Sequence, residues 1–360
     1  MDPNSPPLNR EMKTLLTARF APESLRCLEE KLGAVHRAGF GITGRKLNRD
    51  ELRAASADAD IVIVEFETLD RDFFASAPEL RLAACCRNEP GASVDLDAAT
   101  MAGVPVLFPP GRNAVSVAEY TIGMMISISR HVHVGHHLLR HTDTLTKVSY
   151  ADKLDARNRV TSEWSLEPGA PFHQFQGPEL YGKCLGLVGC GMIGREIARR
   201  ARAFGMALQV ADPYAPAEVI AALDAQPATL AEVATNADFL VIAAKVTPET
   251  RGLVSREVLA RLKPSAYVIN SARASIVDYD ALTELLRERR IAGAALDVFV
   301  EEPLPAESPL WSLENLLITP HTAAVTERLW DRHFDLIVEN LGRLLADEPL
   351  LNQVDTKLGY

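Results

Sequence analysis

The sequence predicts an α/β fold of two Rossmann-like, doubly wound parallel-sheet domains with an interdomain cleft. The chain has 360 residues, about 2.4 times a typical domain of ~150 residues. Its hydrophobic content of 47% and charged content of 24% are those of a globular protein, which excludes collagen-like and disordered chains. Short apolar runs alternate with segments of helical period, and this alternation is typical of parallel sheets.

A first group of apolar runs predicts one sheet. Each run has the length of a buried strand, and a helical segment separates it from the next. The runs are 14–18, 61–64, 82–85 and 104–107. A helix is predicted over 115–139, and the segment 142–178 after it is polar and weakly periodic. We therefore place the crossing between the two domains near Ser116.

A second group of runs predicts a second sheet with helices between its strands. These runs are 185–188, 207–211, 239–243, 266–269, 294–298 and 316–318. The last predicted helix, 327–345, lies beyond this sheet and carries apolar residues at helical spacing. We expect this helix to return to the first domain.

The composition also limits the partners of the protein. The chain has 38 Lys and Arg against 48 Asp and Glu, and its net charge of −10 repels nucleic-acid phosphates and anionic lipid surfaces. The longest apolar stretch, 117–129, contains Glu119 and is shorter than the ~18 residues that a membrane helix needs. Residues 1–10 lack a signal-peptide pattern, and the five cysteines include no CxxC pair. We expect a cytoplasmic protein with reduced thiols and no nucleic-acid or membrane partner.

The sharpest local signal is a glycine turn that joins a predicted strand to a predicted helix. The sequence LGLVGCGMIG places Gly189, Gly191 and Gly194 between the strand 185–188 and a helix that extends to about Phe204. In a GxGxxG turn the first glycine permits the tight turn and the second lets a pyrophosphate approach the backbone. The third glycine lets the helix pack closely on the sheet.

The start of this helix and a later acidic residue complete the pattern of a dinucleotide site. Free amides at Met192 and Ile193, with the partial positive charge of the helix start, favour a phosphate. Asp212 follows the next strand, 18 residues after Gly194, close to the ~20 expected for the carboxylate that binds the adenosine ribose. Because this carboxylate repels a 2′-phosphate, we predict NAD rather than NADP. The alternative is a glycine turn in a sheet that binds no nucleotide.

Three polar residues each lie just past a predicted strand of the second sheet. They are Arg273, Glu302 and His321. Ligands of open α/β sheets gather at the carboxyl ends of strands. An arginine can hold a carboxylate by two parallel hydrogen bonds, and a histidine transfers protons near neutral pH. A glutamate beside the histidine orients the imidazole. In isolation each residue could instead belong to a surface ion pair or to the core.

Four segments of the second domain form an ordered series. They are GKCLGLVGCGMIGREIARRARAFGM, TPETRGLVSREVLARLKPSAYVINSARASIVDYDALTELL, AALDVFVEEPLP and NLLITPHTAA, and PGRNAVSVAEYTIGMM precedes them. This series resembles the D-isomer-specific 2-hydroxyacid dehydrogenase family, which includes phosphoglycerate, D-lactate and glyoxylate/hydroxypyruvate enzymes. The resemblance runs from about Leu80 to Glu327, and ordered blocks are more specific than any single motif.

The resemblance implies how the chain is divided and assembled. It implies a discontinuous substrate domain, 1–116 plus 326–360, and an NAD-binding domain, 117–325. It also implies a homodimer that is built largely through the second domain.

The resemblance also implies roles for individual residues. Arg273 is expected to be the substrate clamp and electrophile, His321 the acid/base and Glu302 its partner. Asp297 is expected near the nicotinamide amide, and Asn113 beside the substrate in the cleft.

The sequence departs from the family pattern in three places. Ala243 and Lys245 stand where many relatives have histidine and proline. Ala274 stands where the family usually has a glycine after the catalytic arginine. The segment 85–95 replaces a glycine-rich loop whose amides bind the substrate carboxylate in the family. Here Arg87 is a candidate substrate contact, with Asn88 and Glu89 beside it, and a surface turn is the alternative. Substrate identity is the property that this change leaves open.

A cluster of histidines lies in the predicted helix 115–139 and just beyond it. Its members are His131, His133, His136, His137 and His141. Spacing of four residues could let two of them share a metal ion, but no acidic or cysteine ligand is near them in the sequence. We therefore predict a solvated or oligomer-facing helix surface and no metal.

The sequence thus predicts an NAD-dependent oxidoreductase that interconverts a D-2-hydroxy acid and its 2-oxo acid. An enzyme of the formate-oxidising type would carry a glutamine beside the histidine, and Glu302 argues against it. An NAD-sensing binding protein with little turnover, like the corepressor relatives of these dehydrogenases, is the alternative from another class.

Overall fold

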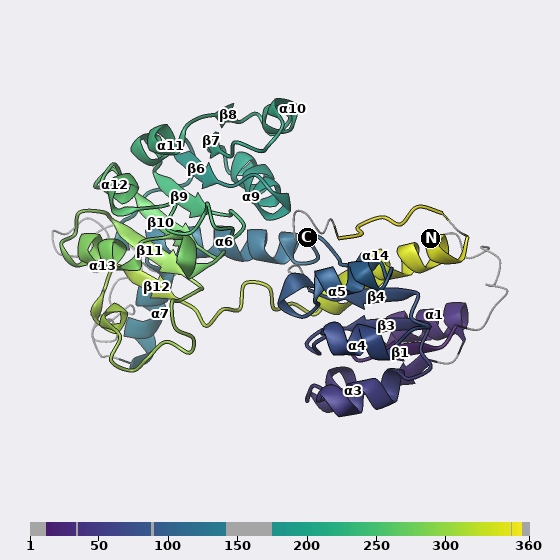
Figure 1. The fold of residues 1–360 in the computed structure, drawn as a ribbon. Coiled ribbons are helices and arrows are strands. Elements are labelled where there is room, and N and C mark those ends of the chain that lie inside the picture. Colours follow the sequence, from purple (N-terminus) through teal and green to yellow (C-terminus); the bar gives the residue numbers. More distant parts are fainter. Residues whose placement is uncertain (1–11, 34, 88–89, 142–174, 347, 355–360) are drawn as a thin grey trace, which may run out of the picture. The chain divides into compact units, whose positions relative to one another are not determined.

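The computed structural model describes residues 12–33, 35–87, 90–141, 175–346 and 348–354 (Figure 1). The chain forms two compact units. The first comprises Met1–Asn113 together with Thr326–Tyr360, and the second comprises Ala114–Val325. The division falls where the helix α6 begins, at Ala114, two residues before Ser116.

The first unit contains a five-stranded sheet with the order β2-β1-β3-β4-β5, in which all neighbours are parallel. Its strands are β1 (Thr14–Leu16), β2 (Val35–Arg37), β3 (Ile61–Val64), β4 (Leu82–Cys85) and β5 (Val106–Leu107). Its helices are α1 (Pro22–Leu32), α2 (Phe40–Thr43), α3 (Arg49–Ser56), α4 (Arg71–Ser76), α5 (Leu96–Met101) and α14 (Leu329–Leu345).

The core of this sheet consists of strands that are buried on both faces. Every residue of β3 and β4 is buried, as expected where helices cover both sides of a parallel sheet. The helix α14 packs on one of these faces because its apolar residues recur at helical spacing. Phe334, Ile337, Val338 and Leu341 share a core cluster with residues of β1, β3 and β4. Burying each such side chain contributes about 1.5–3 kcal/mol to the free energy of unfolding.

The second unit contains a seven-stranded parallel sheet with the order β12-β11-β10-β9-β6-β7-β8. Its strands are β6 (Cys184–Val188), β7 (Ala207–Ala211), β8 (Gln226–Pro227), β9 (Phe239–Ile242), β10 (Tyr267–Asn270), β11 (Gly293–Leu296) and β12 (Leu316–Ile318). The strand order reverses at β6, which pairs with β7 on one side and with β9 on the other. Since all strands are parallel, their carboxyl ends share one edge, and the reversal point of that edge is where open α/β sheets bind ligands.

Helices surround this second sheet. They are α6 (Ala114–Ser129), α7 (Val132–His141), α9 (Met192–Ala203), α10 (Ala217–Ala221), α11 (Leu230–Asn236), α12 (Arg256–Leu259) and α13 (Tyr279–Arg287). The prediction of one helix over 115–139 was wrong, because α6 ends at Ser129 and α7 begins at Val132. His131 lies between them at φ +53°, a left-handed conformation that cannot continue an α-helix.

Candidate active site

The glycine turn follows β6 and requires glycine for steric reasons. Gly189 has φ +97°, and a Cβ there would lie 2.6 Å from backbone atoms of Ala244. A Cβ on Gly194 would lie 2.3 Å from the carbonyl oxygen of Gly189, so α9 packs directly on the turn. A Cβ on Gly191, by contrast, would meet no described atom within 4 Å. The space outside Gly191 is therefore open, as a bound pyrophosphate requires.

The first turn of α9 offers free backbone amides next to that open space. Gly191 is the N-cap of the helix and supplies no capping side chain. The amides at Met192 and Ile193 therefore have no acceptor within the helix, and the helix dipole gives them a partial positive charge. Because this arrangement binds anions without a charged side chain, the turn fits the diphosphate of a dinucleotide.

Asp212, which follows β7, is bound to the glycine turn. One of its oxygens accepts a hydrogen bond from the amide of Cys190 at 2.6 Å. The other accepts from the amides of Tyr214 and Ala215 at 2.9 and 3.1 Å. Sequence reasoning did not anticipate these contacts, which fix the carboxylate at the reversal point of the sheet. A carboxylate has about four acceptor sites, so one remains for a ribose hydroxyl.

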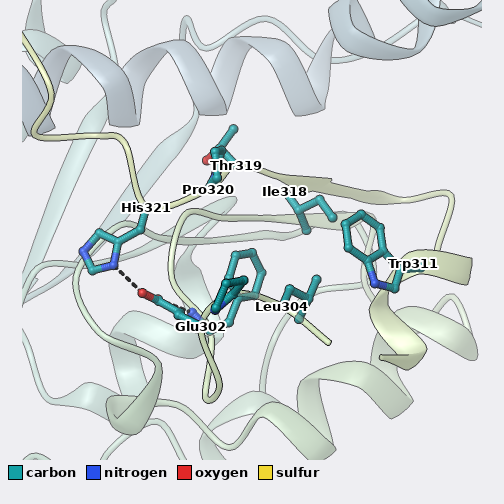
Figure 2. A pocket seen from close by; sticks show the side chains of 9 residues that line it. Glu302, Leu304, Trp311, Ile318, Thr319, Pro320 and His321 are labelled. Atoms are coloured by element: carbon teal, nitrogen blue, oxygen red, sulfur yellow. Dashed lines mark hydrogen bonds and ion pairs between the residues drawn. The ribbon is translucent and has the colours of Figure 1, made fainter. Parts of the chain in front are cut away.

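Two of the three polar residues predicted to react lie in direct contact. Glu302 follows β11 and His321 follows the neighbouring strand β12. Nδ1 of His321 is 2.7 Å from Oε2 of Glu302, and the two side chains point toward each other in Figure 2. The other carboxylate oxygen of Glu302 accepts a hydrogen bond from the amide of Phe299 at 2.9 Å. The carboxylate is therefore held from two sides and orients the imidazole.

Arg273 follows β10, the strand next to β11. Its backbone is extended at φ −147°, its side chain is exposed, and its Nη1 donates to the carbonyl oxygen of Ala272 at 2.7 Å. Its charge reaches Glu302. Burial acts to raise the pKa of Glu302, but the hydrogen bonds from His321 and Phe299 and the charges of His321 and Arg273 bring that pKa below its usual value. The structure thus brings both Arg273 and His321 within electrostatic range of Glu302.

Asp297 follows β11 and stabilises the loop that carries His321. Its side chain is fully buried. One carboxylate oxygen accepts from the hydroxyl of Thr319 at 2.6 Å and from the amide of Thr322 at 2.9 Å, and the other accepts from the amide of Ala323 at 2.9 Å. These bonds hold a loop in which His321 adopts φ +55°. An acidic residue at the end of a buried strand is the signal in the sequence that could have indicated this role.

A cavity of about 600 Å³ lies beside the Glu302–His321 pair in the second unit (Figure 2). Its lining is mostly apolar. The lining residues are Phe299, Glu302, Pro303, Leu304, Trp311, Ile318, Thr319, Pro320 and His321. The Glu302–His321 pair therefore borders a space from which apolar walls can exclude water.

The candidate substrate residues Arg87 and Asn113 belong to the first unit. Arg87 follows β4, and its guanidinium carbon lies 5.3 Å from the ring centre of Phe66. Asn113 is the last residue before α6. Asn88 and Glu89, together with most of the segment 142–178, lie outside the described residues.

The histidine cluster lies at His131 and along α7. The rings of His137 and His141 lie 5.0 Å apart, and Nδ1 of His133 is 3.2 Å from the carbonyl oxygen of Ser127. Burial lowers the pKa of His131 and of His133. In the described part of the chain, no three His, Cys, Asp or Glu side chains come together as metal ligands would. Among the same residues, no helix is long and apolar enough to span a membrane.

Comparisons with known proteins identify the family of the chain. The family model of the D-isomer specific 2-hydroxyacid dehydrogenase, NAD binding domain, matches residues 122–323. A D-3-phosphoglycerate dehydrogenase of Methanocaldococcus jannaschii is 34% identical over 96% of this chain, and the chain spans 59% of that relative's length. A Bacillus subtilis protein named as a 2-hydroxyacid dehydrogenase, YoaD, is 33% identical over 94% of this chain and 92% of its own.

Further likenesses extend over most of the chain. A glyoxylate reductase of Pyrococcus furiosus is 33% identical over 82% of both chains. A solved structure of a protein from Thermus thermophilus is 31% identical, with a TM-score of 0.74 over 95% of this chain and 100% of that one. These findings confirm the predicted fold class and the NAD cofactor. The chain therefore belongs to the D-isomer specific 2-hydroxyacid dehydrogenase family, and its second unit is the NAD-binding domain of that family.

Proposed function

We propose that the protein is an NAD-dependent oxidoreductase that interconverts a D-2-hydroxy acid and its 2-oxo acid. The observation that carries the proposal is the 2.7 Å contact between His321 and Glu302, beside Arg273, at the carboxyl edge of a sheet whose glycine turn fits a dinucleotide. Proton transfer, substrate binding and cofactor binding are the functions that such a reaction requires of the protein. Membership of a dehydrogenase family supports it.

In this proposal the glycine turn holds the cofactor. Gly189, Gly191 and Gly194 leave room for the diphosphate, and the amides of Met192 and Ile193 bind it. When bound, the nicotinamide supplies or accepts the hydride.

Two carboxylates complete the cofactor site in the same proposal. The carboxylate of Asp212 binds the adenosine ribose and disfavours a 2′-phosphate. Asp297 lies beside the nicotinamide amide and keeps the loop of His321 in place.

His321 then moves the proton. Its Nδ1 faces Glu302, so Nε2 is the ring nitrogen available to the substrate. In the reductive direction the protonated imidazole donates its Nε2 proton to the carbonyl oxygen of the 2-oxo acid, and the negative charge of Glu302 stabilises the imidazolium beforehand. In the oxidative direction the neutral imidazole accepts the hydroxyl proton at Nε2.

Arg273 holds the substrate carboxylate and polarises the adjacent carbonyl, for which a planar guanidinium is suited. Arg87 and Asn113 add substrate contacts from the first unit, which we propose is the substrate domain. The relatives named as D-3-phosphoglycerate dehydrogenase and glyoxylate reductase indicate the size range of 2-oxo acids worth testing. We also propose that the chain works in the cytoplasm and that it forms a homodimer. Light scattering on the purified protein would test the homodimer.

The activity is tested by NADH oxidation, followed by absorbance, against a panel of 2-oxo acids. The variant His321→Asn removes the acid/base group and keeps a residue that tolerates a positive φ. His136→Ala, on the exposed face of α7, is the matched control. We expect turnover with at least one acid and a loss of about 10²–10⁴-fold in the His321 variant only. Tight NADH binding without turnover on any acid would instead favour the binding-protein alternative.

A further inference from the structure

The side chain of Tyr279 is bound to two loops of the second unit that carry residues of the candidate active site. Tyr279 is the first residue of α13 and is buried. Its hydroxyl donates a hydrogen bond to the carbonyl oxygen of Val298 at 2.6 Å and accepts one from Nδ2 of Asn270 at 3.3 Å. The hydroxyl therefore connects the last residue of β10 with the segment that follows β11.

Asn270 determines the path of the loop that carries Arg273. Its Oδ1 accepts a hydrogen bond from the amide of Ala272 at 3.0 Å, and its Nδ2 donates one to the carbonyl oxygen of Arg273 at 3.1 Å. An asparagine that bonds the backbone two residues further on stabilises a turn. Asn270 is fully buried, and its bond to Tyr279 comes from the same nitrogen that holds Arg273. One end of the bridge thus fixes the backbone of Arg273.

The other end of the bridge fixes the peptide group that holds Glu302. The carbonyl oxygen of Val298 and the amide of Phe299 belong to one planar peptide unit. The carbonyl accepts from the hydroxyl of Tyr279, and the amide donates to Oε1 of Glu302 at 2.9 Å. Because the unit is planar, the bond to the hydroxyl also sets the direction in which the amide points. Glu302 in turn lies 2.7 Å from Nδ1 of His321.

The hydroxyl of Tyr279 remains a donor at neutral pH. Burial raises the pKa of Tyr279 above its usual value, although the hydrogen bond from Asn270 opposes this shift. The negative charges of Glu302 and Asp297 raise this pKa further, so both carboxylates lie within electrostatic range of the hydroxyl. A buried network in which each polar group has a partner is rigid and costly to break.

We propose that Tyr279 is a positioning residue of the reaction, because its hydroxyl bridges the peptide group that orients Glu302 and the amide that fixes the Arg273 loop. The bridge keeps the acid/base partner and the substrate clamp at a constant separation. A displacement of about 1 Å in a reacting group can cost about 10²-fold in rate. This inference rests on the proposed function, since the roles of Glu302 and Arg273 belong to it.

Hydrogen exchange tests the bridge independently of turnover. Tyr279→Phe keeps the ring and removes the hydroxyl. Tyr267→Phe is the matched control, because Tyr267 is also buried but lies at the amino end of β10. Exchange of the backbone amides in the full chain is followed by mass spectrometry, which reports local opening.

We expect faster exchange over 271–275 and 298–302 in Tyr279→Phe only, and unchanged exchange over the glycine turn, 189–194. Equal exchange in the two variants would overturn the proposal. Asn270→Ser removes the donor to both Tyr279 and Arg273, and it replaces Tyr279→Phe if that variant does not fold. It should raise exchange over 271–275, and exchange equal to that of the control would again overturn the proposal.

Kinetics then measure what the bridge contributes to the reaction. We expect Tyr279→Phe to lower kcat about tenfold and to raise KM for the 2-oxo acid. The dissociation constant of NADH should change less than twofold, because the glycine turn is outside the bridge. Tyr267→Phe should behave as the wild type. A variant Tyr279→Phe with the kcat and KM of the control would contradict the positioning role.

A double-mutant cycle with Glu302→Gln separates positioning from a loss of stability. If the hydroxyl acts through Glu302, its removal lowers kcat about tenfold in the wild type and less than twofold in the Glu302→Gln background. The same factor in both backgrounds would show that Tyr279 acts only on the fold, which overturns the proposal. Absence of turnover with every 2-oxo acid would contradict the proposed function and leave the exchange result standing.

Discussion

Thr319 donates its hydroxyl hydrogen bond to the buried carboxylate of Asp297 across 2.6 Å, and this bond ties the loop of His321 to the end of β11. The same carboxylate accepts hydrogen bonds from the backbone amides of Thr322 and Ala323, which follow His321 in the chain. Residues before and after the histidine in the chain therefore bind the same acidic side chain. Because a left-handed residue is strained unless its surroundings fix it, these contacts keep the imidazole in position.

Asp297→Asn is expected to loosen this loop. The amide nitrogen of an asparagine would face a backbone N–H that now donates to the carboxylate, which costs about 1–3 kcal/mol for a buried group. We expect the melting temperature to fall by a few degrees and the reductive kcat to fall at least tenfold. Thr319→Val is the control, because it removes one hydrogen bond and keeps both backbone contacts. An Asp297→Asn variant with the kcat of the control would contradict this role.

Glu302→Gln is expected to slow proton transfer without weakening cofactor binding. The amide oxygen can still accept the Nδ1 hydrogen of His321, but the negative charge that stabilises the imidazolium is lost. We expect kcat to fall about 10–100-fold and the NADH dissociation constant to change less than twofold. Glu301→Gln, one residue earlier and exposed, should behave as the wild type. Equal kcat values for the two variants would remove Glu302 from the mechanism.

Two glycines of one turn are expected to respond in opposite ways to alanine. Gly191→Ala adds a methyl group to open space, so the protein should keep its melting temperature and lose NADH affinity at least tenfold. Gly194→Ala places its methyl group against the carbonyl oxygen of Gly189, an overpacking that costs about 1–3 kcal/mol. Its melting temperature should fall by a few degrees. Thermal melts and NADH fluorescence titrations measure the two effects, and a reversed pattern would contradict the assignment.

Stability of the first unit should depend on pH through His333. This residue is fully buried. Its Nδ1 accepts a hydrogen bond from Arg112, and its Nε2 lies 2.8 Å from the carbonyl oxygen of Arg19. Because Nδ1 accepts and Nε2 faces an acceptor, the ring is neutral and carries its proton on Nε2. Burial and the charge of Arg112 lower the pKa of His333 from 6.5 to about 3. Between these two pKa values the unfolded chain binds the proton more readily, so stability falls as the pH falls through this range. The slope is at most about 1.4 kcal/mol per pH unit.

Urea unfolding at neutral pH and at a pH about two units lower measures this slope. Trp330 in the first unit reports the transition once Trp164 and Trp311 are replaced by phenylalanine. His333→Gln does not titrate, so its stability should change less between the two pH values than that of the parent. The same pH dependence in both proteins would show that other groups determine it.

The strands could be predicted from the sequence wherever burial governs the residue choice. The runs 61–64, 82–85, 207–211 and 316–318 are strands with those bounds. The edge strands β2 and β8 were missed because their side chains are largely exposed and polar, so no apolar run marks them. The break between α6 and α7 was missed because it depends on a positive φ at His131, a non-glycine residue.

The site was predictable in part for a similar reason. Polar residues just past a predicted strand, such as Arg273, Glu302 and His321, stand out in the sequence. Contacts that depend on the path of loops do not. The bonds from Asp212 to the glycine turn and from Asp297 to the His321 loop join backbone amides, and any residue type except proline can supply an amide.

The split of the first unit between the two ends of the chain also affects synthesis on the ribosome. The nascent polypeptide would expose the apolar sheet face of β1, β3 and β4 that α14 covers, because α14 emerges only after all of Ala114–Val325 has been translated. The NAD-binding unit can complete its fold first, while the apolar sheet face of the first unit is still exposed. We expect this exposed face to need chaperone protection until the final helix leaves the exit tunnel.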